Sequence, residues 1–214
     1  VVALKTACIE NAPPDAAGAT ASLKRILNGE TLDPPGHYEP LTDYLLHHAF
    51  DVAGERDLVV AAHSGVWGDF RAVDCKFMLT MALGHPQTDF DLFHLGMPFV
   101  SDAVTVAKNM ANVHLNLCWS HVFSQTQVCR AVEEILDQVA ISKVTAFGAD
   151  YGLPVEKVVG HLHMARENFA QVFGRRIDRG LMHFDEAIEI LHMWFWDNPL
   201  ALYGRAAKAM GLSG

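Results

Sequence analysis

The chain has 214 residues, of which 50% are hydrophobic and 19% charged, and a formal net charge of −9. This composition is typical of a globular protein and excludes disorder, coiled coil and collagen. An acidic chain gains nothing from counterion release on a phosphate backbone, so nucleic acid is not an expected partner. The sequence shows no signal peptide and no apolar run near the roughly 20 residues of a membrane span, which predicts a cytoplasmic protein without membrane contact.

Five short runs that are apolar on both faces predict strands of a parallel sheet covered on both sides. Longer segments with helical periodicity lie between them. This alternation predicts an α/β fold in which crossover helices join parallel strands. The predicted strands cover residues 1–7, 58–62, 90–93, 113–118 and 144–147.

The predicted helices follow the apolar periodicity and the capping signals. Ser124 is a credible N-cap, and Pro154 is well placed in the first turn of a long helix. The stretch 11–38, rich in Ala, Pro and Gly, is expected to be a loop or insertion with a short helix near 23–27. The other helices are expected at 41–50, about 69–83, 101–110, from Ser124 to about 139, and about 184–196, where Asn198-Pro199 ends the helix and starts a short terminal one.

We expect one domain over residues 1–214, with a helical C-terminal end at about 183–214. The four cysteines, which include no CxxC pair, are predicted to be buried reduced thiols. The twelve histidines are many for this length and carry most of the functional information. The terminal helix packs its apolar residues either on the same chain or on a second subunit of a homo-oligomer, and the sequence leaves both open.

Polar residues follow four successive predicted strands. They are His63, His94, His121 and Asp150. The carboxyl ends of strands in a parallel barrel share one face, and that face holds the active site. Two imidazoles and one carboxylate converging there suit a divalent metal such as zinc.

A single histidine after a strand is more often structural, and an aspartate there is often only a helix N-cap; the repetition at the same end of successive strands favours a shared site. Other histidines are weaker candidates. His161 and His163 are two residues apart in a predicted helix, so they point in different directions and cannot chelate together. His47 and His48 diverge for the same reason, and His114 lies near the wrong end of its strand.

The chain resembles the amidohydrolase superfamily, specifically its amidohydrolase-related metal-dependent hydrolases and decarboxylases. This resemblance implies a (β/α)8 TIM barrel of which this chain holds the part from the fourth strand onward. The segment Val2-Ala3-Leu4-Lys5-Thr6 looks like that fourth strand. The motifs that carry the resemblance are Ala62-His63-Ser64-Gly65, Asp91-Leu92-Phe93-His94-Leu95-Gly96, Asn112-Val113-His114-Leu115-Asn116-Leu117, Phe147-Gly148-Ala149-Asp150-Tyr151 and the closing Asn198-Pro199-Leu200-Ala201-Leu202-Tyr203-Gly204.

The resemblance also implies roles for single residues. His63 would match a histidine that contacts the metal or lies beside it, and His94 one that orients or polarises the substrate. Asp150 would match a metal ligand that takes a proton from the attacking water. Lys5 would match a position that carries a carboxylated lysine in some relatives, and here it is expected to be a polar contact with the substrate.

Two features depart from the family pattern. The first strand of the family supplies an HxH pair of metal ligands, and no such pair occurs on a predicted strand here. About five of the eight strands are present, and five parallel strands cannot close this barrel. We therefore expect that the N-terminal half is either missing from this sequence or supplied by another chain.

The function that the resemblance implies is that of a metal-dependent hydrolase acting on an amide, ester or lactone of a small molecule, with Asp150 as general base. The metal is expected to be zinc, with manganese and iron as alternatives. Decarboxylation and sugar-acid isomerisation on the same site are the alternatives, and an inactive half-barrel scaffold or subunit is the non-enzymatic one. The candidate substrate contacts besides Lys5 are Trp67, Arg71, Trp119 and His121.

Overall fold

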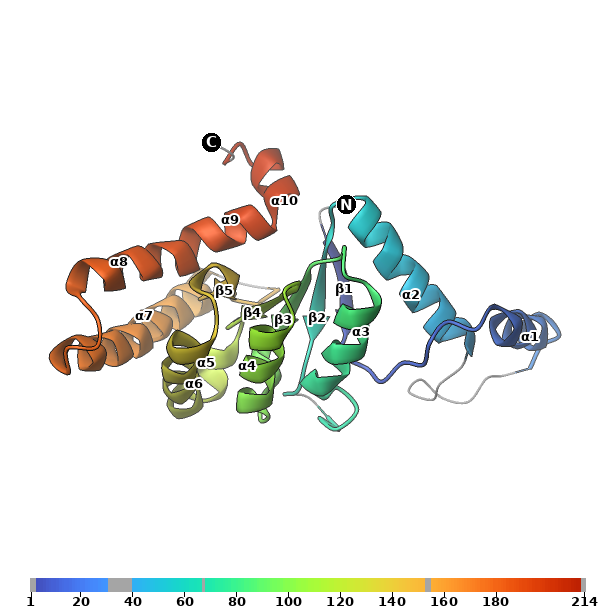
Figure 1. Cartoon of the computed structure of the whole chain (residues 1–214), viewed down its shortest axis with the longest axis horizontal. Helices are drawn as coiled ribbons and strands as arrows, with labels where there is room; N and C mark the ends of the chain where they lie inside the picture. The colour runs from blue at the N-terminus through green and yellow to red at the C-terminus, as the bar shows by residue number, and fades with distance from the viewer. Residues whose placement is uncertain (1–2, 31–39, 67, 153–154, 213–214) are drawn as a thin grey trace.

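The protein was analysed as a computed structural model that describes residues 3–30, 40–66, 68–152 and 155–212. The described residues form a five-stranded parallel sheet in which the strands are paired in the order of the chain (Figure 1). This architecture confirms the α/β fold with crossover helices. Of the first predicted strand, residues 1 and 2 lie outside the described part. The strands are β1 (Ala3–Ala7), β2 (Val59–His63), β3 (Phe90–Phe93), β4 (Val113–Asn116) and β5 (Val144–Thr145).

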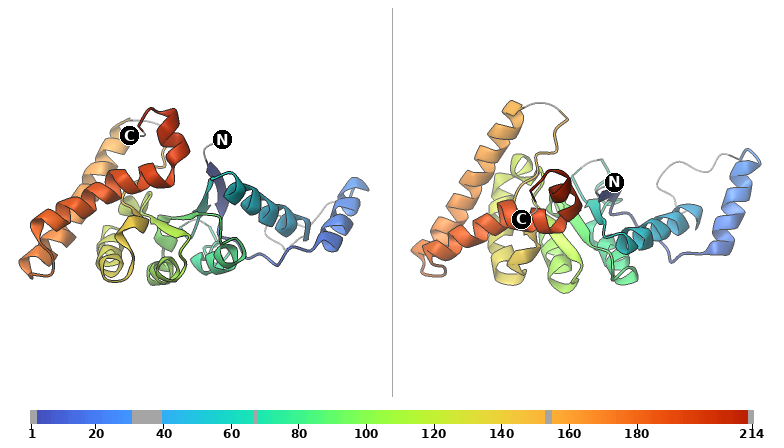
Figure 2. Two further views of the ribbon diagram at one scale, coloured as in Figure 1. Left: turned by 45° about the horizontal axis from the view of Figure 1, so that its top comes forward. Right: turned by 90° about the horizontal axis from the view of Figure 1, so that it is seen from above.

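Helices join the strands in the expected alternation, and Figure 2 shows three of them, α3, α4 and α6, side by side along one side of the sheet. The first connection carries α1 (Ala16–Leu27), which begins earlier than the short helix expected near 23–27, and residues 31–38 of this stretch lie outside the described part. The remaining crossover helices are α2 (Pro40–Glu55), α3 (Met78–Gly84), α4 (Val100–Asn109), α5 (Ser120–Phe123) and α6 (Gln125–Gln138), and α7 (Val155–Asp178) follows the last described strand.

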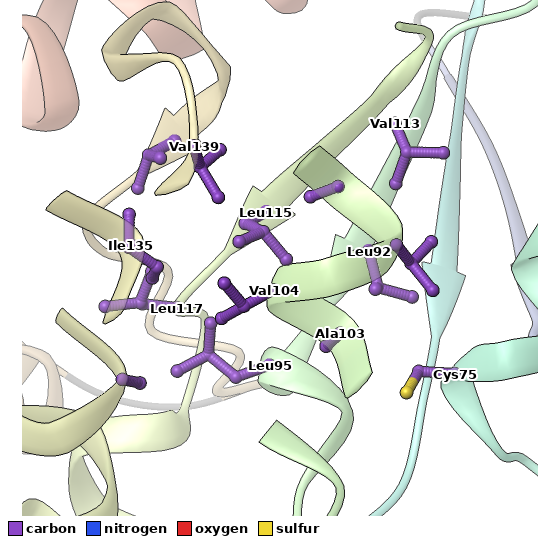
Figure 3. Packing of buried hydrophobic residues seen from close by; sticks show 14 of the residues in the cluster. Cys75, Leu92, Leu95, Ala103, Val104, Val113, Leu115, Leu117, Ile135 and Val139 are labelled. Carbon is purple, nitrogen blue, oxygen red and sulfur yellow. The ribbon is translucent and has the colours of Figure 1, made fainter. Parts of the chain in front are cut away.

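The two faces of the sheet differ in chemistry. On one face, Leu92 and Leu115 pack with the helices in a core that is closed to solvent, and Figure 3 shows Val104 and Ile135 from the helices beside them. Each such side chain contributes about 1.5–3 kcal/mol when it is removed from water. The other face is polar. It carries Lys5, Ala61, Asp91 and His114 in one row of the register, and Ala7, His63, Phe93, Asn116 and Thr145 in the next.

One helix is shorter than predicted. The periodicity over 69–83 predicts one helix, but the chain turns through 69–73 and becomes α-helical only at Met78. The carboxylate of Asp69 accepts a hydrogen bond from the backbone N–H of Arg71, and that of Asp74 accepts one from Lys76. Aspartate side chains that bind the nearby backbone in this way compete with helix formation.

Further along the chain, Ser124 caps α6 as predicted, because its hydroxyl accepts from the N–H of Gln127.

The C-terminal end is helical, but its boundary differs from the prediction. Asn198-Pro199 does not end the preceding helix: α8 (Phe184–His192) continues through one π-helical segment, η4 (Met193–Asp197), into α9 (Asn198–Leu202) and then α10 (Gly204–Ala209). Pro199 has no N–H to donate to the preceding turn, and the carbonyl of Trp194 in η4 accepts instead from the backbone N–H of Ala146. Along this run Trp194 is fully buried, whereas Trp196 is 49% exposed.

None of the described helices combines the length and the apolar character that crossing a membrane requires.

Candidate metal centre

Three of the predicted site residues converge at the carboxyl ends of the strands. His63 is the last residue of β2, His94 follows β3 directly, and Asp150 lies in the loop after β5. In the described structure, Nε2 of His94 lies 3.1 Å from Nδ1 of His63 and 3.8 Å from Oδ2 of Asp150. These three residues therefore share one location, as the strand pattern predicts.

His94 is held in one orientation by its backbone and by a hydrogen bond. Its φ is +69°, the next residue Leu95 has a φ of +54°, and this left-handed turn bends the chain away from the sheet directly after β3. The ring is fully buried, and Nδ1 lies 2.7 Å from the backbone carbonyl of Cys118. Because a carbonyl only accepts, Nδ1 carries the proton, and Nε2 of the neutral ring is left with a lone pair.

His63 is fixed in the same manner. Its Nε2 lies 3.1 Å from the carbonyl oxygen of Gly65 and donates to it, so Nδ1 carries the lone pair. Gly65 has a φ of +61°, and a Cβ at this position would lie 1.8 Å from the carbonyl oxygen of Met97. Only glycine fits there, so the turn that orients His63 depends on it.

The two imidazoles consequently point lone pairs at each other. Burial lowers the pKa of His94 to about 4, and burial followed by the charge of Lys5 lowers the pKa of His63. A bridging proton is therefore disfavoured at neutral pH. A metal ion satisfies both nitrogens: ligands at about 2.0–2.1 Å from a tetrahedral ion lie roughly 3.3 Å apart, close to the observed separation. The donor set thus fits a divalent metal, and the outer hydrogen bonds to Cys118 and Gly65 are of the kind that orients metal-binding histidines.

Cys118 adds a fourth candidate ligand. Its sulfur, a nitrogen of His94 and an oxygen of Asp150 all lie within 4.8 Å of one another. Burial, and next the charge of Asp150, raise the pKa of the thiol to about 12, so it is protonated unless a cation is bound. All four cysteines are buried and unpaired, as predicted. The sequence pattern did not single out Cys118 because it belongs to no CxxC motif.

Lys5 lies on the polar face of the sheet, and its ammonium stands 3.6 Å from the centroid of the Phe93 ring. Desolvation lowers its pKa, and Asp150 is the first of the anionic groups that oppose this shift. The ammonium therefore lies within the field of the cluster, where it can attract an anionic ligand.

Of the other predicted contacts, Arg71 and His121 have partners outside the cluster. Both guanidinium contacts of Arg71 go to Asp69, at 2.8 and 2.7 Å. His121 is fully buried, with Nε2 donating to the carbonyl of Ala146 and Nδ1 accepting from Asn168. Trp119 begins α5 with a φ of +60° and stacks near Phe123. Trp67 lies outside the described residues.

Of the histidines set aside, His161 and His163 both lie in α7, one buried and the other exposed, as the helical spacing predicts. His47 and His48 likewise diverge on α2. Asn116, which the sequence pattern did not single out, is buried at the end of β4, and its side-chain oxygen accepts from the backbone N–H of Cys118 at 2.9 Å. Its place two residues after His114, on the same polar face of the strand, was the signal that could have identified it.

The sequence matches no family model and no curated protein. Solved structures are similar to it in fold. A "putative metal-dependent hydrolase" from Lactobacillus casei ATCC 334 aligns with a TM-score of 0.77 and 14% identity over 96% of this chain and 55% of its own. Uronate isomerase from Thermotoga maritima aligns with a TM-score of 0.73 and 16% identity over 93% of this chain and 48% of its own.

Glucuronate isomerase from Caulobacter crescentus aligns with a TM-score of 0.69 and 15% identity over 94% of this chain and 46% of its own. The chain thus spans about half the length of these structures. Five parallel strands in chain order with crossover helices are part of a TIM barrel. The chain therefore shares the fold of about half of each of these structures, in agreement with the partial TIM barrel that the sequence analysis expects.

Proposed function

We propose that this chain carries the metal site of a metal-dependent hydrolase built on a TIM barrel. The observation that supports the proposal is the pair of facing, unprotonated nitrogens of His63 and His94, with the carboxylate of Asp150 beside them. Those two nitrogens and the Asp150 carboxylate would hold the ion, and the sulfur of Cys118 is within reach. A bound divalent ion would supply Lewis acidity and lower the pKa of a water molecule towards neutrality.

The residues of the chain have distinct tasks in this proposal. Asp150, which is about half exposed, accepts the proton of the attacking water at a carboxylate oxygen and returns it to the leaving group. The ring of His94, held by Cys118, keeps Nε2 aimed at the position that the ion would take. Lys5 attracts an anionic substrate to the polar face of the sheet. Zinc suits a set of imidazole, carboxylate and thiolate ligands better than a harder ion does.

The rest of the barrel would complete this site. Five parallel strands leave the polar face open, and the similar structures are about twice as long as this chain. We propose that a further set of strands, in the same polypeptide or another, closes the barrel over Lys5 and His63 and supplies additional ligands.

Sugar-acid isomerisation is a second candidate function. It is favoured by the similarity in fold to uronate isomerases, with TM-scores of 0.73 and 0.69. Such a reaction needs a group that takes a proton from one carbon and delivers it to a neighbouring one, and Asp150 beside Lys5 can provide this. Decarboxylation would use the same residues, whereas a scaffold without activity would need none of them.

The test is made on the full-length protein. We expect stoichiometric zinc, manganese or iron by elemental analysis, and turnover of one member of a panel of amides, esters, lactones and uronates. The variant Asp150→Asn should lower kcat by about 10² or more, because a general base is lost, with an unchanged circular-dichroism spectrum. Asp178→Asn, at the exposed end of α7, is the matched control and should leave kcat unchanged.

The panel separates the candidate reactions. Turnover of a uronate indicates isomerisation, and turnover of an amide, ester or lactone indicates hydrolysis. Retention of kcat within about tenfold in Asp150→Asn would contradict the role of this residue. Protein that holds no metal after expression in metal-replete medium, and that turns over nothing in the panel, would favour the scaffold.

A further inference from the structure

Asn116 has a fixed place between the sheet and the site. It is the last residue of β4, it is buried, and it pairs in register with Phe93 and Thr145. Its Nδ2 donates to Oδ2 of Asp91 at 2.7 Å, and its Oδ1 accepts from the backbone N–H of Cys118 at 2.9 Å. A carboxylate can only accept and a backbone N–H can only donate, so the orientation of the amide is unambiguous.

Cys118 connects this amide to His94. The sheet pairing of this strand continues as far as Leu117, whose N–H donates to the carbonyl of Thr145, and Trp119 then turns with a φ of +60°. The N–H of Cys118 is satisfied by Asn116, and its carbonyl accepts the proton of Nδ1 of His94 at 2.7 Å. These two groups belong to the peptides on either side of the Cα of Cys118, so the backbone at Cys118 links the amide of Asn116 to the tautomer of His94.

Asp91 and Tyr203 hold the other side of the amide. Asp91 is fully buried in the middle of β3, and its Oδ2 accepts from Asn116 and also from the hydroxyl of Tyr203, at 2.6 Å. Burial raises the pKa of Asp91, and the two donors oppose that shift. Tyr203 directly follows α9, so this contact joins the C-terminal helices to the polar face of the sheet.

We propose that Asn116 is a positioning residue for the metal site, and that Asp91 and Tyr203 fix its amide so that Cys118 presents His94 with Nε2 free for the ion. The inference rests on the proposed function, because it assigns the relay to that same site. It adds three residues which do not touch the cluster of His63, His94 and Asp150 through their own side chains.

A relay of this kind acts on affinity for the ion. Loss of a partner that orients a metal-binding histidine typically weakens metal binding 10–100-fold. Without the oxygen of Asn116, the N–H of Cys118 loses its acceptor and the backbone at Cys118 can rotate. The carbonyl of Cys118 can then shift away from Nδ1 of His94. His94 can place its proton on Nε2 instead, and a proton there opposes binding of the ion.

The first measurement is zinc affinity of the full-length protein, by competition with a chromophoric chelator. Asn116→Leu should bind zinc about 10–100-fold more weakly than the unmodified protein. The matched control is Asn112→Leu, because Asn112 donates to three backbone carbonyls, those of Ala82, His85 and Thr88, at the other end of the same strand. Its loss should lower stability and leave zinc affinity within about twofold of the starting value.

The second measurement needs no metal. Nitrogen-15 NMR of the imidazoles in the metal-free protein should show the Nδ1–H tautomer of His94, and a mixture of tautomers in Asn116→Leu. If Asn116→Leu does not fold, Tyr203→Phe serves instead, because it removes only a hydroxyl. This variant should weaken zinc binding about three- to tenfold, a smaller effect than direct loss of the amide.

The outcomes separate the two proposals. A protein that binds no zinc contradicts the proposed function, while the NMR measurement still tests the relay. If zinc binds, the inference is overturned when Asn116→Leu, or Tyr203→Phe in its place, keeps zinc affinity within twofold and leaves the tautomer of His94 unchanged.

Discussion

Two histidines of this protein, His94 and His121, are both fully buried, yet they differ in what their rings leave unsatisfied. His121 uses both nitrogens, towards Ala146 and Asn168, so it is complete without a ligand. His94 uses one nitrogen towards Cys118 and aims the other at a second lone pair. The hydrogen bonds of the ring nitrogens, more than burial, therefore distinguish His94 from His121.

The structural histidine predicts a pH dependence of stability. Burial lowers the pKa of His121 to about 4, whereas an unfolded histidine titrates near about 6.5. As the pH falls from about 6.5 towards 4, His121 takes up a proton in the unfolded state before it does so in the folded state. The free energy of unfolding therefore falls below about pH 6.5 and is unaffected by this group above that pH. Between pH 6.5 and pH 5 this amounts to about 2 kcal/mol.

The measurement is urea unfolding at pH 7 and pH 5 of the unmodified protein and of His121→Gln. Glutamine can donate to Ala146 and accept from Asn168 but does not titrate in this range. We expect the variant to lose about 2 kcal/mol less between the two pH values than the unmodified protein. An identical pH dependence in the two proteins would show that His121 does not titrate as the buried ring requires.

At the scale of single residues, the sequence predicts that His63, His94 and Asp150 lie together. The apolar runs show where each strand ends, and parallel strands bring their carboxyl ends to one face. The sequence does not predict tautomers, which depend on the carbonyls of Gly65 and Cys118. The roles of Cys118 and Asn116 are not predictable either. They depend on hydrogen bonds to the N–H and the carbonyl of Cys118, which form in a turn after β4 that no sequence motif indicates.

The strands were predictable to within two residues at each described end, because runs that are apolar on both faces have few alternatives in a chain of this kind. Two helix boundaries were not. The start of α3 is decided by Asp69 and Asp74, whose carboxylates bind the backbone and override the apolar periodicity. Pro199 is accommodated by a π-helical segment before it, which periodicity cannot show.

An element-scale contact joins α2 to the segments around it. Nδ1 of His47 lies 2.6 Å from Nε2 of His85, Nε2 of His47 donates to the carbonyl of Ala12, and Nδ1 of His85 lies 2.7 Å from the carboxylate of Asp51. Burial, and next the charge of His85, lower the pKa of His47. The chain of contacts ties the segment before α1 and the end of α3 to α2.

Removing this contact should cost stability. His47→Leu leaves the carbonyl of Ala12 and a nitrogen of His85 without their partner, so we expect the free energy of unfolding to fall by about 1–3 kcal/mol. His48→Leu, its exposed neighbour on α2, should change it by less than about 0.5 kcal/mol. Both are measured by urea unfolding at pH 7. Equal effects of the two variants would show that the contact does not stabilise α2.

At the scale of the whole molecule, the polar face of the sheet sets this chain apart from an ordinary α/β protein. Both faces of a parallel sheet are normally covered, whereas here Lys5 is exposed and His63 and Phe93 are only partly buried. The similar structures are about twice as long as this chain, which covers about half of each. A residue such as Lys5 is unremarkable on a surface, but inside a closed barrel it becomes a charged group next to the site.

The proposed site requires a single ion held by residues at the carboxyl ends of three different strands. The direct measurement is anomalous diffraction from crystals of the full-length protein grown with zinc, with data collected on both sides of the zinc absorption edge. We predict one peak within about 2.0–2.2 Å of Nδ1 of His63, Nε2 of His94 and an oxygen of Asp150. A zinc peak elsewhere, with these three groups still facing one another and no ion between them, would contradict the account.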